Sequence, residues 1–323
     1  MEAIGVRLVY MGTSAFAVPT LRALFEAGYS IAGVVTQPDK PGGRGHSLQA
    51  SPVKQEAARL HLSVYQPATL KDDAARALFE ALQPDMLVVA AYGKLVPPWL
   101  IALPRYGVLN LHGSLLPKYR GAAPIQRAVA NGERETGVCT MRIDEGLDTG
   151  PVYLCEKTPI GSDETSEDVS IRLATLGSRL MIRTVEGVVT GTLQPAPQDP
   201  TQATYAPPLK KEEGRIDWTW PAPIVHNKVR GFRPWPGTVT KFRDAVCKIL
   251  QSKVGQATPS AAAPGTILAT KPSLAVVCGD GTLLEVVEIQ APGRKPLAGV
   301  DFANGMRIRA GEKFEPVVDN DQG

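Results

Sequence analysis

Residues 108–117 read Val-Leu-Asn-Leu-His-Gly-Ser-Leu-Leu-Pro, and the architecture is best inferred by starting from this stretch. An apolar run that ends in polar residues is typical of a buried strand whose carboxyl end reaches a surface. Side chains two residues apart share one face of a strand, so Asn110 and His112 emerge side by side. A lone histidine is more often a core residue, but packing explains this pair less well. At the carboxyl end of a parallel strand, the pair predicts a ligand site.

The first two hundred residues alternate short β-rich runs with helical patterns. Strands are predicted at residues 6–10, 31–36, 86–91 and 137–143. A long amphipathic helix is expected after Thr165, whose hydroxyl precedes Asp168 at the spacing of a helix N-cap. Strands that alternate with helices form βαβ units around a parallel sheet. We therefore expect an α/β domain at the start of the chain.

A proline-rich stretch separates this domain from the rest of the chain. Five prolines between Gln194 and Pro208 indicate an extended connection of restricted flexibility. Beyond it, short strands such as residues 283–289 alternate with glycine-containing turns, a pattern typical of a small β-barrel. The expected organisation is a first domain over residues 1–193, a linker over 194–212 and a second domain over 213–323.

Composition places the chain among ordinary folded proteins, with 43% hydrophobic and 21% charged residues. No segment has a signal-peptide pattern or the length needed to span a bilayer, so we expect a cytoplasmic protein without a membrane partner. The cysteines are far apart and lack the spacing of a zinc site, so we expect no metal and reduced, mostly buried thiols. They are Cys139, Cys155, Cys247 and Cys278.

A second polar cluster, residues 144–150, reads Asp-Glu-Gly-Leu-Asp-Thr-Gly after a predicted strand. A plain surface turn would explain it, because aspartate and glycine favour turns. An aspartic protease would need two Asp-Thr-Gly sequences, and the chain has one. Together, however, Asn110, His112 and Asp148 suit acyl transfer to an amine. The amide and imidazole can donate hydrogen bonds to an oxyanion, while the carboxylate orients the imidazole or helps to manage the amine proton.

Such a reaction needs no nucleophilic side chain, and the sequence offers none in a recognised setting. It lacks a Gly-x-Ser-x-Gly elbow, and its cysteines lie outside the polar clusters. It also lacks a Gly-x-Gly-x-x-Gly after the first strand and a phosphate-binding Gly-x-x-x-x-Gly-Lys-Thr/Ser. A nucleotide-dependent reaction is therefore not expected.

Several motifs resemble the signature of the folate-dependent formyltransferases, the superfamily of glycinamide ribonucleotide formyltransferase. They are Asn110-x-His112, Ser114-Leu-Leu-Pro117, Arg120-Gly-Ala-Ala-Pro124 and Leu147-Asp148-Thr-Gly150. Further motifs across nearly the whole chain resemble the methionyl-tRNA formyltransferase family within that superfamily. They are residues 36–45, 203–207, 214–218, 232–237 and 301–302. One position departs from the pattern, because Gly113 stands where a larger residue such as alanine is expected.

The resemblance implies a Rossmann-like formyltransferase domain and a C-terminal domain similar to an OB-fold barrel. It implies 10-formyltetrahydrofolate as the formyl donor and the amino group of methionyl initiator tRNA as the acceptor, for translation initiation. Asn110, His112 and Asp148 would be the catalytic residues. The residues implied to line the folate site are Ser114, Leu115, Leu116, Pro117, Tyr92, Gly93 and Lys94.

The second half has a charge that suits a tRNA. Residues 206–323 contain 16 Lys+Arg and 12 Asp+Glu, against 19 and 20 in the remainder, although a solvated basic face would explain this equally well. Basic residues and tryptophans are interleaved over residues 213–253, but we expect at least two of the tryptophans to pack in the core. Residues 37–46 are too rich in proline and glycine for regular structure and predict a mobile basic loop. The expected tRNA contacts are Lys40, Arg44, Arg215, Arg230 and Arg233.

Two other functions stay open. A formyltransferase or formyl-folate hydrolase acting on a small-molecule amine would use the same three residues, but it would not need the basic second domain. A non-catalytic nucleic-acid-binding module would not need the intact set of Asn110, His112 and Asp148. We expect a monomer.

Overall fold

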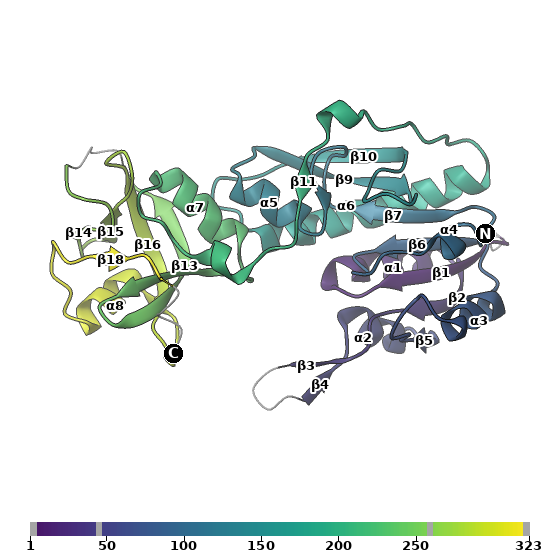
Figure 1. The fold of residues 1–323 in the computed structure, drawn as a ribbon, viewed down its shortest axis with the longest axis horizontal. Helices are drawn as coiled ribbons and strands as arrows, with labels where there is room; N and C mark the ends of the chain where they lie inside the picture. Colours follow the sequence, from purple (N-terminus) through teal and green to yellow (C-terminus); the bar gives the residue numbers. More distant parts are fainter. Residues whose placement is uncertain (1–4, 43–46, 257–260, 319–323) are drawn as a thin grey trace. The chain divides into compact units, whose positions relative to one another are not determined.

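The computed structural model describes residues 5–42, 47–256 and 261–318. The chain divides into two compact units (Figure 1). The first unit comprises residues 1–124, 136–158 and 170–207, and the second comprises 125–135, 159–169 and 208–323. Each unit has its own sheet and its own hydrophobic core.

The first unit is built on a seven-stranded sheet in the order β10-β9-β7-β6-β1-β2-β5. The strands are β1 (Arg7–Gly12), β2 (Ser30–Val35), β5 (Val64–Tyr65), β6 (Met86–Ala90), β7 (Val108–His112), β9 (Glu135–Arg142) and β10 (Val152–Pro159). The strands from β7 to β5 are parallel, and β9 is antiparallel to β7. This largely parallel sheet confirms the predicted Rossmann-like α/β class.

Helices connect these strands, and three of them begin at capping side chains, including the predicted cap Thr165, whose hydroxyl accepts from the Asp168 N–H. The helices are α1 (Val18–Glu26), α2 (Pro52–Arg59), α3 (Asp73–Leu82), α4 (Pro98–Ile101) and α6 (Ser166–Val189). Ser51 accepts a hydrogen bond from the Lys54 backbone N–H at the start of α2, and Asp72 accepts one from Ala75 at the start of α3. Such caps satisfy N–H groups that have no partner within the helix.

Residues 40–42 differ from the expectation of an irregular loop over residues 37–46, of which 43–46 lie outside the described residues. Strands β3 (Lys40–Gly42) and β4 (Ser47–Gln49) form a two-stranded antiparallel ribbon. Proline is tolerated there because a ribbon of two strands consists only of edges. Before the ribbon begins, the Lys54 ammonium donates a hydrogen bond to Asp39 Oδ2 at 2.6 Å.

The expectation of four reduced cysteines is wrong for one pair, because Cys139 and Cys155 form a disulfide. Cys139 lies on β9 and Cys155 on β10, and these strands are neighbours in the sheet, with the two Cα atoms 4.1 Å apart. The loop between the strands returns the chain beside itself, a proximity that residue spacing alone does not reveal. Cys247 and Cys278 are free and buried, as expected.

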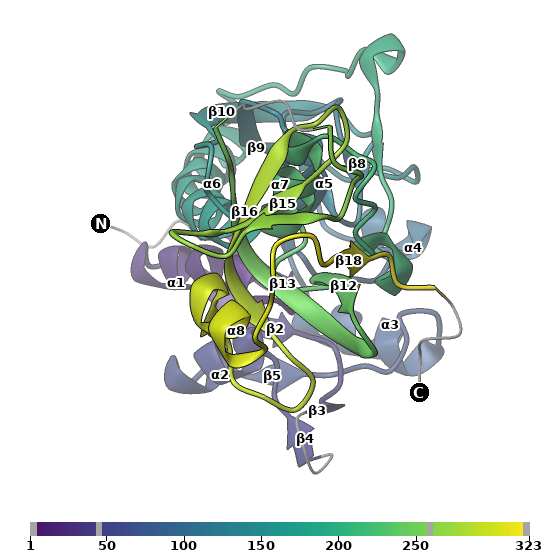
Figure 2. The same ribbon diagram turned by 90° about the vertical axis from the view of Figure 1, so that its left-hand side faces the viewer.

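The second unit contains an antiparallel sheet in the order β14-β15-β16-β13-β12-β18, with β17 paired to β16. The strands are β12 (Thr238–Phe242), β13 (Ala245–Val254), β14 (Ile267–Ala269), β15 (Leu274–Val277), β16 (Leu283–Gln290), β17 (Leu297–Ala298) and β18 (Phe314–Glu315). Its helices are α5 (Pro124–Ala130), α7 (Ala222–Gly231) and α8 (Gly299–Gly305), the last lying beside β16 (Figure 2).

The two ends of this sheet meet and nearly close a barrel. Phe314 donates a backbone hydrogen bond to Gly265 O at 2.9 Å, and Ile267 donates one to Glu312 O at 2.8 Å. These bonds join the chain around β14 to the chain around β18. The predicted small β-barrel is therefore confirmed.

Two tryptophans pack in the core of this barrel, as expected. Trp218 is buried, stacks against Phe314 and donates its indole N–H to Thr240 Oγ1 at 2.9 Å. Trp220 packs against the same core, whereas the side chain of Trp235 is exposed. Among the helices that the structure describes, none combines the length and hydropathy needed to cross a membrane.

Candidate active site

Strand β7 carries the predicted pair of polar side chains to the carboxyl edge of the first unit's sheet. Most of the strand is buried, Asn110 is half-buried, and His112, its last residue, is buried. In the register of β7 and β9, Asn110 lies opposite Met141 and His112 opposite Cys139. The strand is therefore rigidly paired up to the point where the imidazole emerges.

The imidazole of His112 has an oxygen atom near each of its nitrogens. Nε2 is 2.9 Å from the backbone oxygen of Tyr119, and Nδ1 is 3.6 Å from Asp148 Oδ2. A carbonyl oxygen only accepts hydrogen bonds, so Nε2 carries a proton in this arrangement. A second proton on Nδ1 would lie toward a carboxylate. The imidazole is thus held between a backbone carbonyl and a carboxylate.

Asp148 is held in an unusual backbone conformation. Its φ of +51° lies in the left-handed region, which non-glycine residues adopt uncommonly. The backbone N–H of Gly121 donates to Asp148 Oδ2 at 2.8 Å and fixes the carboxylate near His112. Two residues on, a Cβ at Gly150 would stand 1.9 Å from Arg142 O, so only glycine fits. Close backbone packing therefore shapes this loop.

The other aspartate of the same loop, Asp144, bonds within the loop itself. Asp144 Oδ1 accepts hydrogen bonds from Thr149 Oγ1 at 2.7 Å and from the Gly146 N–H at 3.1 Å. These bonds close the turn on itself, which is the ordinary role of aspartate in a loop. Of the two carboxylates, Asp148 is thus the one that faces the histidine.

The residues after β7 form a closed turn. Ser114 is fully buried and donates its hydroxyl to Lys118 O at 2.6 Å, while the Lys118 N–H donates to Leu115 O at 3.1 Å. Leu115, Leu116 and Pro117 are half-buried. The turn therefore presents partly accessible apolar side chains beside the polar pair.

The other predicted folate segment follows β6, the parallel neighbour of β7. Tyr92 O accepts hydrogen bonds from Thr13 Oγ1 at 2.9 Å and from Gln37 Nε2 at 2.8 Å. Lys94 donates from its ammonium to the backbone oxygens of Pro67 and Ala68. The structure therefore brings both predicted folate segments to the same edge of the sheet as Asn110 and His112.

Tyr92 also has a buried hydroxyl group that finds no hydrogen-bond partner among the described residues. Burial raises the pKa of this hydroxyl to about 12, so it stays protonated at neutral pH. The position of Tyr92 in the site rests on its backbone carbonyl, which is held from two sides.

The predicted tRNA contacts differ in their surroundings. Lys40 is exposed on β3, and Arg44 lies outside the residues that the structure describes. Arg215 and Arg233 are half-buried, and Arg233 Nη1 lies 3.4 Å from Leu250 O. These positions leave the predictions for Lys40, Arg215 and Arg233 open.

Arg230 lies against backbone carbonyl groups. Its side chain is buried, and Nη1 donates to Gly161 O at 3.0 Å and to Glu164 O at 2.9 Å. Burial lowers the pKa of the guanidinium, although nearby acidic groups oppose that effect. Its prediction as a tRNA contact stays a prediction.

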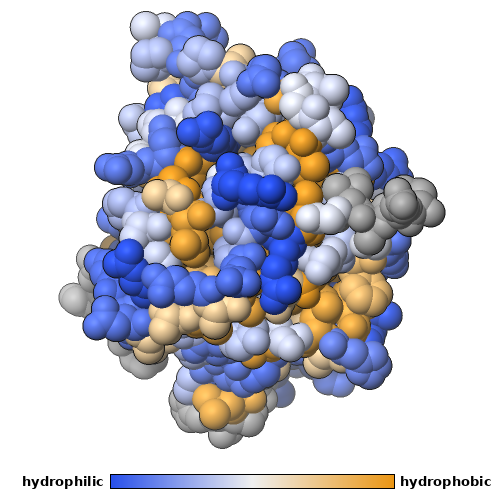
Figure 3. Space-filling model, turned by 90° about the vertical axis from the view of Figure 1, so that its right-hand side faces the viewer, coloured by the Kyte–Doolittle hydropathy of each residue, from blue (hydrophilic) through white to orange (hydrophobic). Residues whose placement is uncertain are grey.

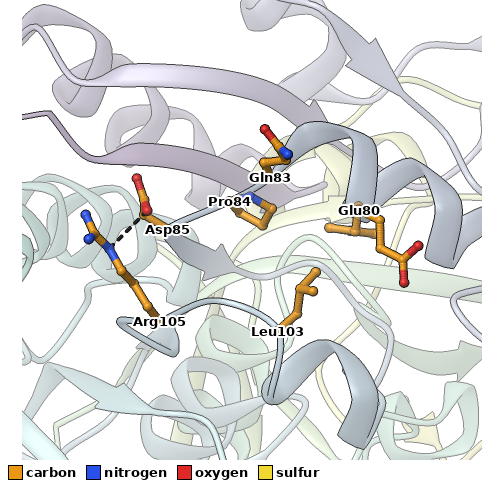
Figure 4. A pocket seen from close by; sticks show the side chains of 7 residues that line it. Glu80, Gln83, Pro84, Asp85, Leu103 and Arg105 are labelled. Carbon is orange, nitrogen blue, oxygen red and sulfur yellow. Dashed lines mark ion pairs between the residues drawn. The ribbon is translucent and has the colours of Figure 1, made fainter.

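A shallow pocket of about 350 Å³ lies on the opposite edge of the first sheet (Figure 4). Asp85, directly before β6, lines it and pairs with Arg105 at 3.0 Å. The amino ends of parallel strands lie away from the carboxyl end that carries His112.

On the face shown in Figure 3, apolar side chains form separate groups among hydrophilic ones. Neither feature extends the site.

Three residues of the site's surroundings were missed by sequence reasoning. Gln198 Nε2 donates to Asp148 O and Gly150 O, Arg120 donates to Gln198 Oε1, and Thr204 Oγ1 accepts from the Tyr119 N–H. Gln198 and Thr204 lie in the stretch predicted as a linker. The only signal for Arg120 was its place in the Arg120–Pro124 motif.

Comparison with known proteins gives consistent results over nearly the whole chain. Residues 6–185 match the family model described as formyl transferase, and residues 208–307 match the formyl transferase C-terminal domain. A methionyl-tRNA formyltransferase of Solibacter usitatus is 49% identical over 96% of this chain and 98% of its own length. One of Trichlorobacter lovleyi is 44% identical over 97% and 98%.

Solved structures share the fold at low identity. An N-formyltransferase of Helicobacter canadensis, in complex with folinic acid and dTDP-3-aminofucose, has a TM-score of 0.66 and 19% identity, covering 88% of this chain and 99% of that one. The sugar 3N-formyl transferase WlaRD, with dTDP and 5-N-formyl-THF, has a TM-score of 0.64 and 17% identity, covering 90% and 99%.

Proposed function

Because the chain belongs to the methionyl-tRNA formyltransferase family, we propose that it transfers the formyl group of 10-formyltetrahydrofolate to the amino group of methionyl initiator tRNA, for translation initiation. The observation that carries the chemistry is the His112–Asp148 pair beside Asn110 at the carboxyl edge of the sheet. This set matches what acyl transfer to an amine requires.

The three side chains divide the work of the reaction. The amine nitrogen attacks the formyl carbon, the bond from that carbon to N10 of the folate breaks, and a proton passes from the amine to the leaving nitrogen. Asn110 donates a hydrogen bond to the oxyanion that forms, and His112 donates a second one from the Nε2–H that otherwise bonds to Tyr119 O. Asp148 stabilises the protonated imidazole of His112 and keeps it oriented. The folate supplies the activated formyl group.

The donor is proposed to lie against the turns that follow β6 and β7. A pterin ring is flat and carries hydrogen-bond donors and acceptors on its edge, so backbone groups beside half-buried apolar side chains suit it. The proposed residues are Tyr92, Gly93, Lys94, Ser114, Leu115, Leu116 and Pro117. Lys94 would act by fixing its turn, because its ammonium is bonded to two carbonyls.

We propose that the tRNA contacts both domains. We assign catalysis to residues 1–193, a connecting role to 194–212 and tRNA binding to 213–323. Cations that meet phosphates release counterions and strengthen binding. The proposed contacts are Lys40, Arg44, Arg215, Arg230 and Arg233. We also propose that the protein acts as a monomer in the cytoplasm, where its tRNA substrate is found.

The acceptor is tested by offering one formyl donor to several amines. The protein is incubated with labelled 10-formyltetrahydrofolate and with methionyl initiator tRNA, methionyl elongator tRNA or free methionine. Label on the initiator alone is the expected result. Label on free methionine at a rate equal to that on initiator tRNA would instead support a small-molecule formyltransferase.

A further inference from the structure

We propose that Gln198, held by Arg120, is a positioning residue that keeps Asp148 directed at His112. This inference rests on the proposed function, because it concerns the same reaction. Gln198 donates its two amide hydrogens to backbone oxygens of the catalytic loop, Asp148 O at 2.8 Å and Gly150 O at 2.7 Å. One side chain thus fastens both sides of the Asp148–Gly150 segment.

The orientation of this amide is fixed by Arg120. The guanidinium donates from Nε at 3.1 Å and from Nη2 at 2.8 Å, both to Gln198 Oε1. A guanidinium only donates, so the atom that it contacts must be the amide oxygen. The amide nitrogen therefore faces the loop. Arg120 is itself 5% exposed, so this charged group is buried and its bonds are shielded from water.

Asp148 needs such support because of its backbone conformation. A positive φ in a non-glycine residue persists where the surrounding structure imposes it. Two groups act on Asp148: the Gly121 N–H holds its carboxylate, and Gln198 holds its carbonyl. Without the second contact, the peptide after Asp148 can rotate, and Oδ2 then leaves the vicinity of His112 Nδ1.

The segment that carries Gln198 is secured independently. Val152 and Ala196 exchange two backbone hydrogen bonds of 2.8 Å, and β11 (Tyr205–Ala206) pairs in parallel with β8 (Arg120–Gly121). Removing the Gln198 side chain therefore leaves its backbone in place. Its loss is expected to act on the catalytic loop. Because it also leaves the buried Arg120 guanidinium without this acceptor, denaturant unfolding of each variant is measured beside kcat.

The test compares Gln198→Ala and Gln198→Glu with Gln202→Ala. Glutamate keeps an oxygen for Arg120 but cannot donate to the loop, so both Gln198 variants should lower kcat by about 10- to 100-fold, as loss of an outer-shell partner does at metal sites. KM for tRNA and folate should stay within about twofold, because neither substrate is bound by Gln198. Gln202 is an exposed glutamine of the same segment that contacts Asp199, so Gln202→Ala should resemble wild type.

Two readouts separate positioning from a merely structural effect. In an Asp148→Ala background, Gln198→Ala should cause no further loss of kcat, because its action passes through Asp148. NMR titration of the His112 ring should also differ between wild type and Gln198→Ala, but not between wild type and Gln202→Ala. Additive losses of kcat, or an active Gln198→Glu variant, would overturn the proposal. If wild type fails to formylate tRNA, the proposed function fails, and an unchanged His112 titration in Gln198→Ala would still refute the positioning role.

Discussion

Strand β7 and residues 196–206 position His112 and its partners in different ways. β7 is a regular, buried strand that delivers Asn110 and His112 through its own pleat. Residues 196–206 have little regular structure, yet they contact the Tyr119–Gly121 segment and the Asp148 loop through side chains and short bridges. One half of the site is therefore set by local geometry and the other by long-range hydrogen bonds.

The largest effect is expected from replacing Asp148, whose carboxylate connects the two halves of the site. Asp148→Asn keeps the shape of the side chain and its contact with the Gly121 N–H, but it removes the negative charge beside His112. We expect kcat to fall by about 10²- to 10⁴-fold, the range of a general acid–base contribution. Steady-state transfer to methionyl initiator tRNA measures this, and a variant within threefold of wild type would contradict the assigned role.

A second change crowds the backbone of the Asp148 loop. Gly150→Ala places a Cβ where Arg142 O already stands, and backbone on both sides has no room to yield. We expect a loss of about 1–3 kcal/mol in the free energy of unfolding, typical of overpacking, together with reduced kcat. Denaturant unfolding of the variant beside Gly305→Ala, whose Cβ meets nothing within 4 Å at a residue without a positive φ, gives the control. Equal stability of Gly150→Ala and wild type would show that the loop is more adaptable than proposed.

The two aspartates of this loop provide a finer comparison. Asp144→Ala removes the bonds to Thr149 and Gly146 that close the turn, but it leaves the carboxylate facing His112. We expect a loss of about 1–2 kcal/mol in stability and a much smaller loss of kcat than for Asp148→Asn. Thermal unfolding and the transfer assay together test this. A larger loss of kcat for Asp144→Ala than for Asp148→Asn would show that Asp144, and not Asp148, is the carboxylate that acts in catalysis.

The smallest expected effect concerns the support of Tyr119. Thr204→Val removes the hydroxyl that accepts from the Tyr119 N–H and keeps the side-chain shape. We expect a loss of about 1 kcal/mol in stability, and kcat to fall by less than in Gln198→Ala. Urea unfolding measures the first and the transfer assay the second. A kcat loss as large as that of Asp148→Asn would show that Tyr119, rather than Asp148, mainly determines the orientation of His112.

The half of the site built by β7 could be predicted from the sequence because its causes are local. An apolar run ending in Asn110 and His112 specifies a strand, its register of faces and its exposed end. The adjacent helices and the barrel strands followed from the same kind of periodicity. Asp148 could be nominated as a partner because it belongs to a polar loop after another strand, and the structure brings it to 3.6 Å.

The other half could not be predicted, because its causes are non-local. Gln198 stands among prolines, and its contacts lie 48 to 78 residues away in the chain. Nothing in that spacing distinguishes a glutamine that fastens a loop from one in a linker. The Cys139–Cys155 disulfide was missed for a similar reason, since the return of β10 beside β9 depends on the fold.

The most direct test of the central claim is single-turnover formyl transfer with His112→Ala beside wild type. Labelled 10-formyltetrahydrofolate and methionyl initiator tRNA are mixed with excess enzyme, and formyl-methionyl-tRNA is followed in time. We predict rapid transfer by wild type and a rate lower by about 10²- to 10⁴-fold in the variant, with folding and tRNA binding intact. Equal rates would contradict the claim that the carboxyl end of β7 is where the formyl group is transferred.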